Sequence, residues 1–248
     1  MKTRTNSSYI KSGLLLLFSS LLFLVACTEK DTSINPETST VTDVDGKVYK
    51  TVKIGDQWWM AENLSVEKFN NGDPISFINA NDLEGWSDTL LPLFCIYQDL
   101  STAPGKLYNY AVVADNRNVA PAGWHVATDE DWKKLEAFIG MNSTEVQKTG
   151  WRGSQGDLIK KAGLNSWSQY NNVWATDEYL FGAMAGGCRL FNGKFSTPTG
   201  LTYNGFWWTR TDYQNGLAWY RYLDYKSSGI FRSHTYKSYG MSIRCVKD

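Results

Sequence analysis

The first hydrophobic stretch of the chain lies near its N-terminus. Residues 13–26 are apolar apart from two serines, and the segment before them carries Lys2, Arg4 and Lys11. A membrane-spanning helix needs about 20 consecutive apolar residues, so this stretch is too short to cross a bilayer. A basic start followed by a short apolar centre is instead typical of a secretory signal peptide. The pattern predicts that residues 1–26 are a signal peptide and take no part in the fold.

The end of this stretch, Leu24-Val25-Ala26-Cys27, resembles the lipobox of bacterial lipoproteins. The resemblance implies cleavage after the small residue Ala26 and attachment of lipid to the sulfur of Cys27. The alternatives are an ordinary secretory signal and one uncleaved helix. Several acyl chains anchor a protein firmly, because each buried methylene contributes about 0.8 kcal/mol. We therefore expect a cell-envelope protein that is held through Cys27 to the outer membrane, facing either the periplasm or the outside.

Residues 27–41 form a polar segment with almost no apolar side chains. Such a segment buries too little surface to offset the conformational entropy that ordering removes. The composition predicts a flexible tether, which together with the lipidated N-terminus that the lipobox resemblance implies covers residues 27–41. The remaining residues, 42–248, suit one globular domain with a large core or two small domains.

Alternation of polar and apolar side chains predicts a β-hairpin near the start of the domain. Residues 47–53 alternate, Gly55-Asp56 suits a turn, and residues 57–61 return. Further along, residues 105–113 form an apolar run that suits either a buried strand or a short helix, because periodicity does not distinguish the two.

One helix is predicted with clear boundaries. Thr128 can cap it, Asp131 stands three residues later as in a capping box, and Gly140 ends it. The side chains expected on its buried face are Trp132, Leu135, Phe138 and Ile139. A second, weaker helix is predicted over residues 156–162.

The segment from Phe181 to Asp248 has the pattern of an antiparallel sheet. Short apolar stretches alternate with turn pairs such as Asn192-Gly193 and Asn215-Gly216. Apolar and polar side chains alternate in residues 241–245, which predicts a last strand that buries one face. Together these elements predict an α+β fold, an antiparallel β-sheet with one or two helices and long irregular loops.

Charge and motif content exclude several functions. Lys plus Arg and Asp plus Glu both number 25 and no basic block is present, so we expect no nucleic-acid partner. The two histidines lack a paired spacing that would predict a metal site. No Gly-x-Ser-x-Gly elbow, phosphate loop or dinucleotide motif is present either. The sequence therefore predicts neither a metal nor a cofactor.

An ordered set of motifs resembles one known family. Its strings are Val52-Lys-Ile-Gly-Asp-Gln-Trp-Trp-Met-Ala-Glu-Asn-Leu64, Gly105-Lys-Leu-Tyr-Asn-Tyr-Ala-Val-Val113, Ala120-Pro-Ala-Gly-Trp-His-Val-Ala-Thr-Asp-Glu-Asp-Trp132, Phe206-Trp-Trp-Thr209 and Tyr239-Gly-Met-Ser-Ile-Arg-Cys-Val-Lys-Asp248. They resemble the Fibrobacter succinogenes major paralogous domain, which is common in Bacteroidota lipoproteins. The resemblance runs from about Thr42 to Asp248 and implies a C-type-lectin-like fold. That fold hosts sugar binders, protein binders and enzymes, so it implies little about function.

Lipidation of Cys27 leaves three cysteines in an oxidising compartment, which allow one pair and one free thiol. The sequence alone does not choose the pair. The resemblance implies a disulfide between Cys95 and Cys245, where the family commonly has cysteine. Cys188 stands where the family usually has an aromatic residue. This departure favours a small buried thiol at Cys188, with pairing as the alternative.

Aromatic residues make up 15% of the chain, and tryptophan occurs 11 times. Neighbouring residues of a strand point to opposite sides, so at most one residue of the pair Trp207-Trp208 packs into a given core. Exposed rings rimmed by polar side chains suit sugar faces and protein interfaces. The candidate ligand-binding residues are Trp208, Trp219, Tyr220, Arg221 and Tyr222. In the alternative, a helix or loop covers both faces of the sheet and buries them.

Three functional hypotheses remain. The first is a non-catalytic module that binds glycan or protein at the cell surface. The second is a structural, self-associating surface protein without a small ligand. The third is an enzyme, either a thiol oxidase that uses Cys188 and Cys245 or a glycosidase that pairs Glu62 with a second carboxylate. The many aromatic residues support the first, whereas the tether, the zero net charge and the absence of a recognisable catalytic set support the second.

Overall fold

The computed structural model of the chain describes Met1 and residues 35–87, 91–171, 173–196 and 201–248. The predicted signal peptide, apart from Met1, and Cys27 lie outside these residues. Strand β1 (Thr38–Thr42) pairs with β2 (Val48–Ile54), so the end of the range predicted as tether belongs to a sheet. No helix in the described part of the chain is long and apolar enough to cross a membrane.

Three β-sheets form the framework of the described residues. The first has the order β1-β2-β3-β12-β7, with β3 at Gln57–Met60, β7 at Trp124–Val126 and β12 at Cys245–Lys247. The second has the order β8-β11-β10-β9, with β8 at Gly150–Arg152, β9 at Asn204–Tyr213, β10 at Leu217–Asp224 and β11 at Ile230–Tyr236. The third joins β4 (Ser76–Phe77), β5 (Leu93–Cys95) and β6 (Leu107–Tyr108). All strand pairs are antiparallel except β4–β5, which confirms a mainly antiparallel α+β fold.

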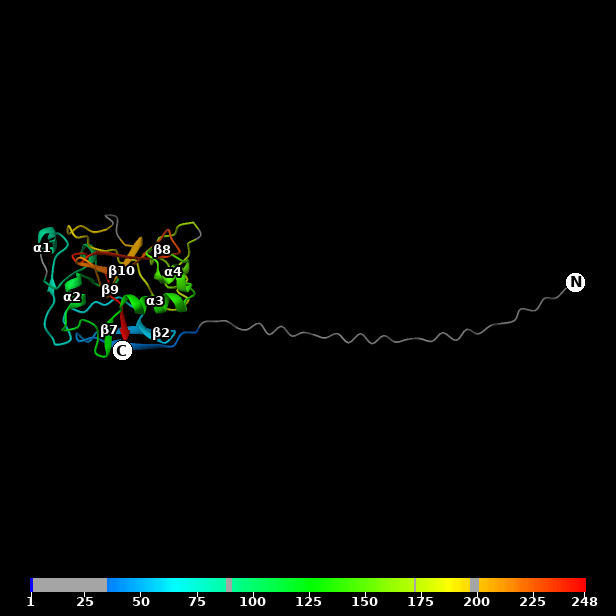
Figure 1. The fold of residues 1–248 in the computed structure, drawn as a ribbon, viewed down its shortest axis with the longest axis horizontal. Helices are drawn as coiled ribbons and strands as arrows, with labels where there is room; N and C mark the ends of the chain where they lie inside the picture. Colours follow the sequence, from blue (N-terminus) through cyan, green and yellow to red (C-terminus); the bar gives the residue numbers. More distant parts are fainter. Residues whose placement is uncertain (2–34, 88–90, 172, 197–200) are drawn as a thin grey trace. The chain divides into compact units, whose positions relative to one another are not determined.

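The helices are short and more numerous than the predicted one or two. Within the described residues they are α1 (Leu83–Ser87), α2 (Tyr110–Ala114), α3 (Asp129–Phe138) and α4 (Ser143–Gln147), with 3-10 turns η1 (Tyr97–Asp99) and η2 (Gln155–Leu158). Figure 1 shows β9 and β10 in the middle of the domain and the C-terminus beside β7, with which β12 pairs. The apolar run 105–113 contains both predicted alternatives, because β6 is followed directly by α2. The weaker helix predicted over residues 156–162 is only the turn η2.

The predicted hairpin and the predicted helix cap are both confirmed. β2 and β3 pair around Gly55-Asp56 with Thr51 opposite Met60. At the start of α3, the Thr128 hydroxyl accepts from the Asp131 backbone N–H at 3.1 Å, and the Asp131 carboxylate accepts from the Thr128 N–H at 2.9 Å. Each pair satisfies a backbone donor that the first turn of a helix leaves open.

Phe138 corrects the predicted buried face of α3. Trp132, Leu135 and Ile139 are buried, but Phe138 is 56% exposed. It is the last residue of the helix, and its ring lies over the turn at Gly55 rather than in the core.

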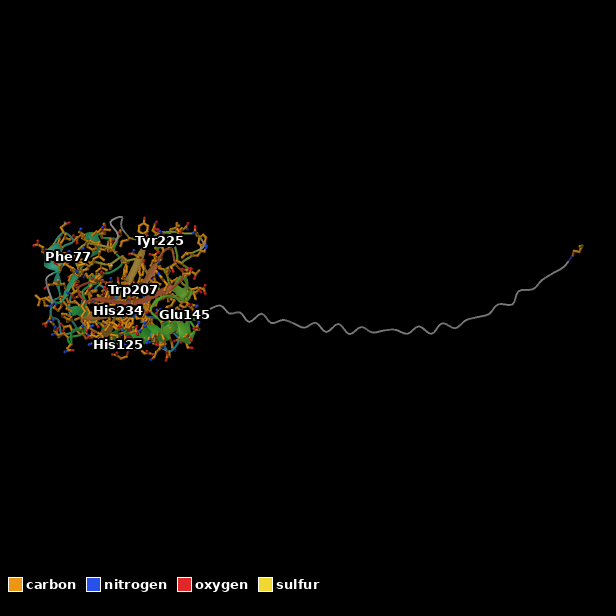
Figure 2. All side chains as sticks on the ribbon, turned by 45° about the horizontal axis from the view of Figure 1, so that its top comes forward. Phe77, His125, Glu145, Trp207, Tyr225 and His234 are labelled. Atoms are coloured by element: carbon orange, nitrogen blue, oxygen red, sulfur yellow. The ribbon has the colours of Figure 1, made fainter. Side chains whose placement is uncertain are left out.

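Both tryptophans of the Trp207-Trp208 pair are fully buried, because the second sheet is covered on its two sides. Trp207 packs against Trp132 of α3 with 6.2 Å between ring centroids, and Trp208 packs against Tyr110 of α2 at 5.3 Å. Both indole N–H groups also donate hydrogen bonds, to the Asn63 side chain and to the Tyr108 carbonyl. Figure 2 shows Trp207 in the middle of the domain. The covered-sheet alternative is therefore the correct one here.

A buried ion cluster joins α3 to the second sheet. Arg221 donates to Glu136 at 2.6 Å and to Asp129 at 2.7 Å. Arg232 holds Asp129 with two hydrogen bonds, and Arg152 holds Glu136 with two more. Removing one partner from such a cluster leaves an uncompensated buried charge, which costs roughly 3–5 kcal/mol.

Two further buried arginines bind backbone rather than carboxylates. Arg189 donates to the carbonyl oxygens of Asn79, Ala80 and Asp82, among others. Arg244 donates to the carbonyls of Met60, Phe181 and Gly182, and to the Asn63 side chain. Burial without a carboxylate partner lowers the pKa of Arg244 to about 9. Each guanidinium fixes a loop to the sheets through its main chain.

The implied disulfide between Cys95 and Cys245 is wrong for this structure. Cys95, Cys188 and Cys245 are all free and buried. Cys95 lies on β5 in a small core with Trp86 and Leu107, whereas Cys245 pairs with Val126 in the first sheet. The two thiols therefore belong to different sheets and different hydrophobic cores.

Candidate functional site

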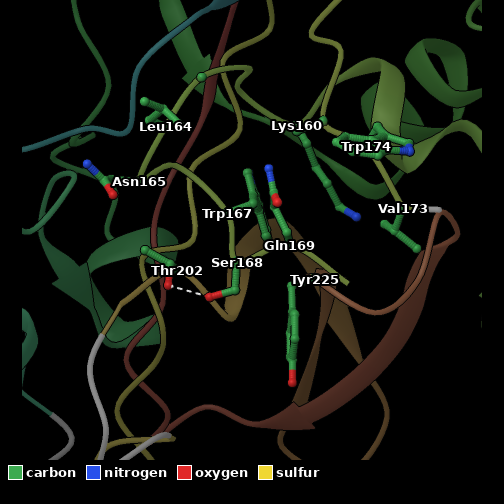
Figure 3. A pocket seen from close by; sticks show the side chains of 12 residues that line it. Lys160, Leu164, Asn165, Trp167, Ser168, Gln169, Val173, Trp174, Thr202 and Tyr225 are labelled. Carbon is green, nitrogen blue, oxygen red and sulfur yellow. Dashed lines mark hydrogen bonds between the residues drawn. The ribbon is translucent and has the colours of Figure 1, made fainter. Parts of the chain in front are cut away.

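A cavity of about 540 Å³ is lined by side chains from residues 160–171 and 173–175, together with Thr202 and Tyr225, and we call it the loop cavity (Figure 3). Three aromatic residues contribute to its lining, namely Trp167, Trp174 and Tyr225. Four uncharged polar residues line it as well: Asn165, Ser168, Gln169 and Thr202. Among the described residues of the lining, Lys160 is the only charged one. A concave site with a few convergent polar groups is the usual form of a small-ligand site.

Lys160 lies two residues after the end of η2 and belongs to the lining of the cavity. Its backbone pairs with Ala183, which fixes the start of the segment. The ammonium group donates to Asp157 Oδ1 at 2.9 Å and to the Ser227 carbonyl at 2.7 Å. The side chain is 1% exposed, and desolvation by this burial lowers the pKa of Lys160. The cation is thus held rigidly beside a compensating carboxylate.

Trp167 forms a rigid part of the cavity wall. Its indole N–H donates to the Ala183 carbonyl at 2.9 Å, and the Lys160 ammonium lies 5.3 Å from its ring centroid. The next residue, Ser168, shares a 2.8 Å hydrogen bond with the Thr202 hydroxyl, which is drawn in Figure 3. These contacts bring residues from two separate chain segments to one wall.

Trp174 differs from Trp167 because its ring is open to solvent. It is 58% exposed, and no ring or cation contact is recorded for it within the described residues. Tyr225, in contrast, packs edge to face on Tyr170 and Tyr203, with centroids 5.8 and 5.2 Å away. Figure 2 places Tyr225 at the rim of the domain. The described lining of the cavity therefore has two fixed aromatic side chains, Trp167 and Tyr225, and one open ring, that of Trp174.

The hydrogen-bonding groups of the two amide side chains in the described lining are also open to a ligand. Within the described residues, neither Asn165 nor Gln169 has a side-chain hydrogen bond. Asn165 adopts a left-handed conformation with φ of 68°, which asparagine tolerates better than most residues. Each amide offers both donors and an acceptor to a ligand.

Comparison with known families assigns the chain. The model of the Fibrobacter succinogenes major domain matches residues 52–247. The chain belongs to this family. No curated protein and no solved structure matches it.

Two of the residues predicted to bind ligand in this Fibrobacter major domain are inaccessible to a ligand. Trp208 and Arg221 are both 0% exposed. Trp208 lies in the core against α2, and Arg221 belongs to the buried ion cluster. The prediction failed because it assumed that one face of the second sheet meets solvent.

In the Fibrobacter major domain, Tyr220 and Tyr222 are half-buried on the face of the second sheet that also carries Trp208, and Tyr222 belongs to an aromatic row. Tyr222 stands opposite Phe206 on β9 and Phe231 on β11, and Phe231 stands opposite Trp151 on β8. Phe206 and Tyr222 stack with centroids 4.5 Å apart and planes 11° apart. The two ring faces therefore contact each other within the sheet, and such cross-strand pairs stabilise it.

Trp219, the last predicted residue, points to the opposite side of β10. The Arg232 guanidinium lies 3.8 Å from its ring centroid, and the His234 ring packs edge to face on it at 5.4 Å. It is half-buried in a cation–π contact and contributes nothing to the loop cavity.

A second groove of the Fibrobacter major domain contains Glu62, the carboxylate considered for a glycosidase pair. It measures about 640 Å³ and is lined by Glu62, Lys161 and Asp177, along with residues of β1 and β2. Desolvation by burial raises the pKa of Asp177 to about 6. The Asp177 carboxylate nevertheless accepts the Gly182 N–H at 2.8 Å, and Glu62 accepts the Lys50 N–H at 2.7 Å, so both have structural roles. Among the described residues, no group of three His, Cys, Asp or Glu side chains could hold a metal ion.

The sequence does carry a sign of the loop cavity that the periodicity argument missed. Trp167-Ser-Gln-Tyr-Asn-Asn-Val-Trp174 places three aromatic residues in a polar, turn-forming stretch. Aromatic residues that no strand or helix pattern explains are candidates for a binding loop.

Proposed function

We propose that this protein is a non-catalytic glycan-binding module and that the sugar binds in the loop cavity. The observation that carries the proposal is the open ring of Trp174 beside a cavity lined by uncharged polar groups. Sugar rings present apolar C–H faces, which suit aromatic rings, and hydroxyl groups, which suit amides and hydroxyls. Trp174 supplies the stacking surface, and Asn165 and Gln169 supply hydrogen bonds.

Replacement of Trp174 tests this proposal. We expect Trp174→Ala to reduce glycan affinity at least about tenfold, because a lost hot-spot aromatic residue typically costs more than about 1–2 kcal/mol. The chain without residues 1–27 is screened on a broad glycan array with and without calcium, and hits are measured by calorimetry. Trp151→Ala is the matched control, because Trp151 is also exposed but lies outside the cavity. A blank array, or equal affinities of the two variants, contradicts the proposal.

We also propose that the module is anchored to the outer membrane through lipid on Cys27. The support is the lipobox sequence before Cys27 and the start of β1 only a short distance downstream, at Thr38. The C-type-lectin-like fold belongs to the same proposal. Its support is that the first and last strands of the domain share one sheet while the segment 160–175 forms the cavity outside it.

A further inference from the structure

Strand β1 forms an edge of the first sheet, and this edge has the properties of a surface that pairs with another strand. We propose that the domain forms a symmetric dimer in which β1 pairs antiparallel with β1 of a second copy of the chain. The inference is independent of the proposed glycan binding, because no residue of β1 lines the loop cavity.

β1 presents a row of open backbone groups along its outer side. The Lys53 N–H donates to the Glu37 carbonyl at 2.8 Å, so these two residues form a hydrogen-bonded pair directly before β1. Hydrogen-bonded and non-hydrogen-bonded pairs alternate between antiparallel strands, so Thr38, Thr40 and Thr42 direct their N–H and C=O groups away from β2. β1 is the first strand in the sheet order, and no backbone partner on this side is recorded for the three threonines within the described residues.

The edge lacks the features that usually keep sheet edges from pairing. Its sequence, Thr38-Ser-Thr-Val-Thr42, contains neither a charged residue nor proline, and its register with β2 runs without a bulge. Four of the five residues are exposed and the fifth is half-buried, so no element of the described fold covers the strand. Threonine and valine also favour extended backbone. An uncharged, uncovered edge of this kind is a template for a further strand.

A second copy completes this edge in one register. When Thr40 stands opposite the partner's Thr40, Thr38 stands opposite the partner's Thr42, and the twofold axis repeats the same contact on the other side. Each of these three pairs then exchanges two backbone hydrogen bonds, all of them made by groups that β2 leaves open. The threonine side chains meet on one face, where cross-strand threonine pairs stabilise antiparallel strands. The assembly closes at two copies because both β1 edges are then paired.

The short distance in sequence between β1 and the proposed lipid anchor favours a second copy over a different protein. The segment 28–37 joins Cys27 to β1 and spans at most about 36 Å. The β1 edges of all copies anchored in one membrane are therefore confined to a thin layer, which raises their effective concentration. In the antiparallel pair the two copies of Thr38 lie roughly 13 Å apart along the strands, so both anchors reach the same bilayer.

The test uses the chain without residues 1–27. This form contains every strand and helix of the described fold, because the first of them begins at Thr38. Sedimentation is measured between roughly 10 μM and 1 mM, a range that suits a small, weak interface. We expect the wild-type chain to pass from monomer to dimer over this range.

Proline at the centre of the edge removes the proposed contact without removing a bond to β2. We expect Thr40→Pro to raise the dimer dissociation constant at least about tenfold, because it deletes an outward N–H on both copies. Edge strands tolerate proline at such a position, so the fold is retained. Thr40→Val is the matched control, because it keeps the N–H and the branched shape, and we expect it to dimerise as the wild-type chain does. Thermal unfolding checks that both variants are folded.

Two double variants test the register. Thr38→Lys with Thr42→Lys places like charges opposite each other at both ends of the paired strands, whereas Thr38→Lys with Thr42→Glu places opposite charges there. We expect the first pair of substitutions to give a dissociation constant at least about tenfold above that of the second. Salt at about 1 M should reduce this difference, because it screens exposed charges.

Each outcome either supports the dimer or overturns it. A wild-type chain that stays monomeric at 1 mM overturns the inference, and so does a dimer that is equally stable in Thr40→Pro and Thr40→Val. If Thr40→Pro does not fold, the two double variants decide, and equal dissociation constants for them overturn the β1 pairing. A dimer combined with a blank glycan array would refute the proposed function and leave this inference in place.

Discussion

Glu136 holds two of the three guanidinium groups in the buried ion cluster and is itself 0% exposed. We expect Glu136→Gln to lower the free energy of unfolding by roughly 3–5 kcal/mol, because Arg152 and Arg221 lose their shared negative charge. Urea unfolding followed by tryptophan fluorescence measures the change. Glu130→Gln on the exposed side of α3 is the control, with an expected change within about 0.5 kcal/mol. Equal midpoints for the two variants would contradict the assigned role of the cluster.

His125 gives the domain a stability that depends on pH. Its two ring nitrogens form hydrogen bonds with the carboxylates of Asp131 at 3.0 Å and Asp248 at 2.7 Å. The hydrogen bond with Asp131 is the main cause that raises the pKa of His125. The folded state therefore binds this proton more tightly than the unfolded state. The stabilisation is complete below the ordinary pKa of about 6.5 and is lost as the pH rises through the folded value. We expect the unfolding free energy to fall as the pH rises above the ordinary histidine value of about 6.5, and His125→Gln to flatten that slope in urea titrations.

At the scale of elements, the capping box of α3 is the most local structural signal in the chain. We expect Thr128→Ala to destabilise the domain by about 1 kcal/mol, since it removes the side-chain acceptor for the Asp131 N–H. Thermal unfolding measures the loss. Thr144→Ala, at an exposed position within α4, is the comparison and should change little. A smaller effect at Thr128 than at Thr144 would refute the capping assignment.

The elements that the sequence predicts well are those whose causes lie within a few residues. The hairpin around Gly55-Asp56 and the helix that begins after Thr128 depend on turn chemistry, alternation and a cap, all of which can be read locally. Burial of the Trp207-Trp208 pair depends on α2 and α3 packing on opposite sides of β9, which no local pattern specifies. The loop cavity is harder still to predict from the sequence, because Lys160, Trp174 and Tyr225 come together only in the folded chain.

At the scale of the whole molecule, the proposed anchor is tested by phase partition. We expect the full chain, made in a Gram-negative host, to enter the detergent phase of a cloud-point separation, and Cys27→Ser to remain in the aqueous phase. Buried acyl chains supply the difference, at about 0.8 kcal/mol per methylene. Cys188→Ser is the matched control and should still enter the detergent phase. Detergent partition of the Cys27→Ser variant would remove the case for lipid at this residue.

The state of the remaining cysteines is a property of the whole fold. Burial raises the pKa of Cys95 and of Cys188 to about 12 and also raises that of Cys245, so the native thiols are poor nucleophiles. We expect a chromogenic disulfide reagent to detect no thiol in the native chain without residues 1–27. After unfolding without reductant, it should detect all three. One thiol instead of three would restore a disulfide pair.

Arg189 and Arg244 have a consequence for how this domain can diversify. Most of their hydrogen bonds go to main-chain carbonyl oxygens, which every amino acid supplies. A residue in the loops they hold can therefore be exchanged without loss of the contact that fixes the loop. The side chains displayed at the surface are thereby uncoupled from the scaffold that displays them. Gene copies of such a domain can acquire new surface chemistry by substitution in these loops while the arginines and the sheets stay constant.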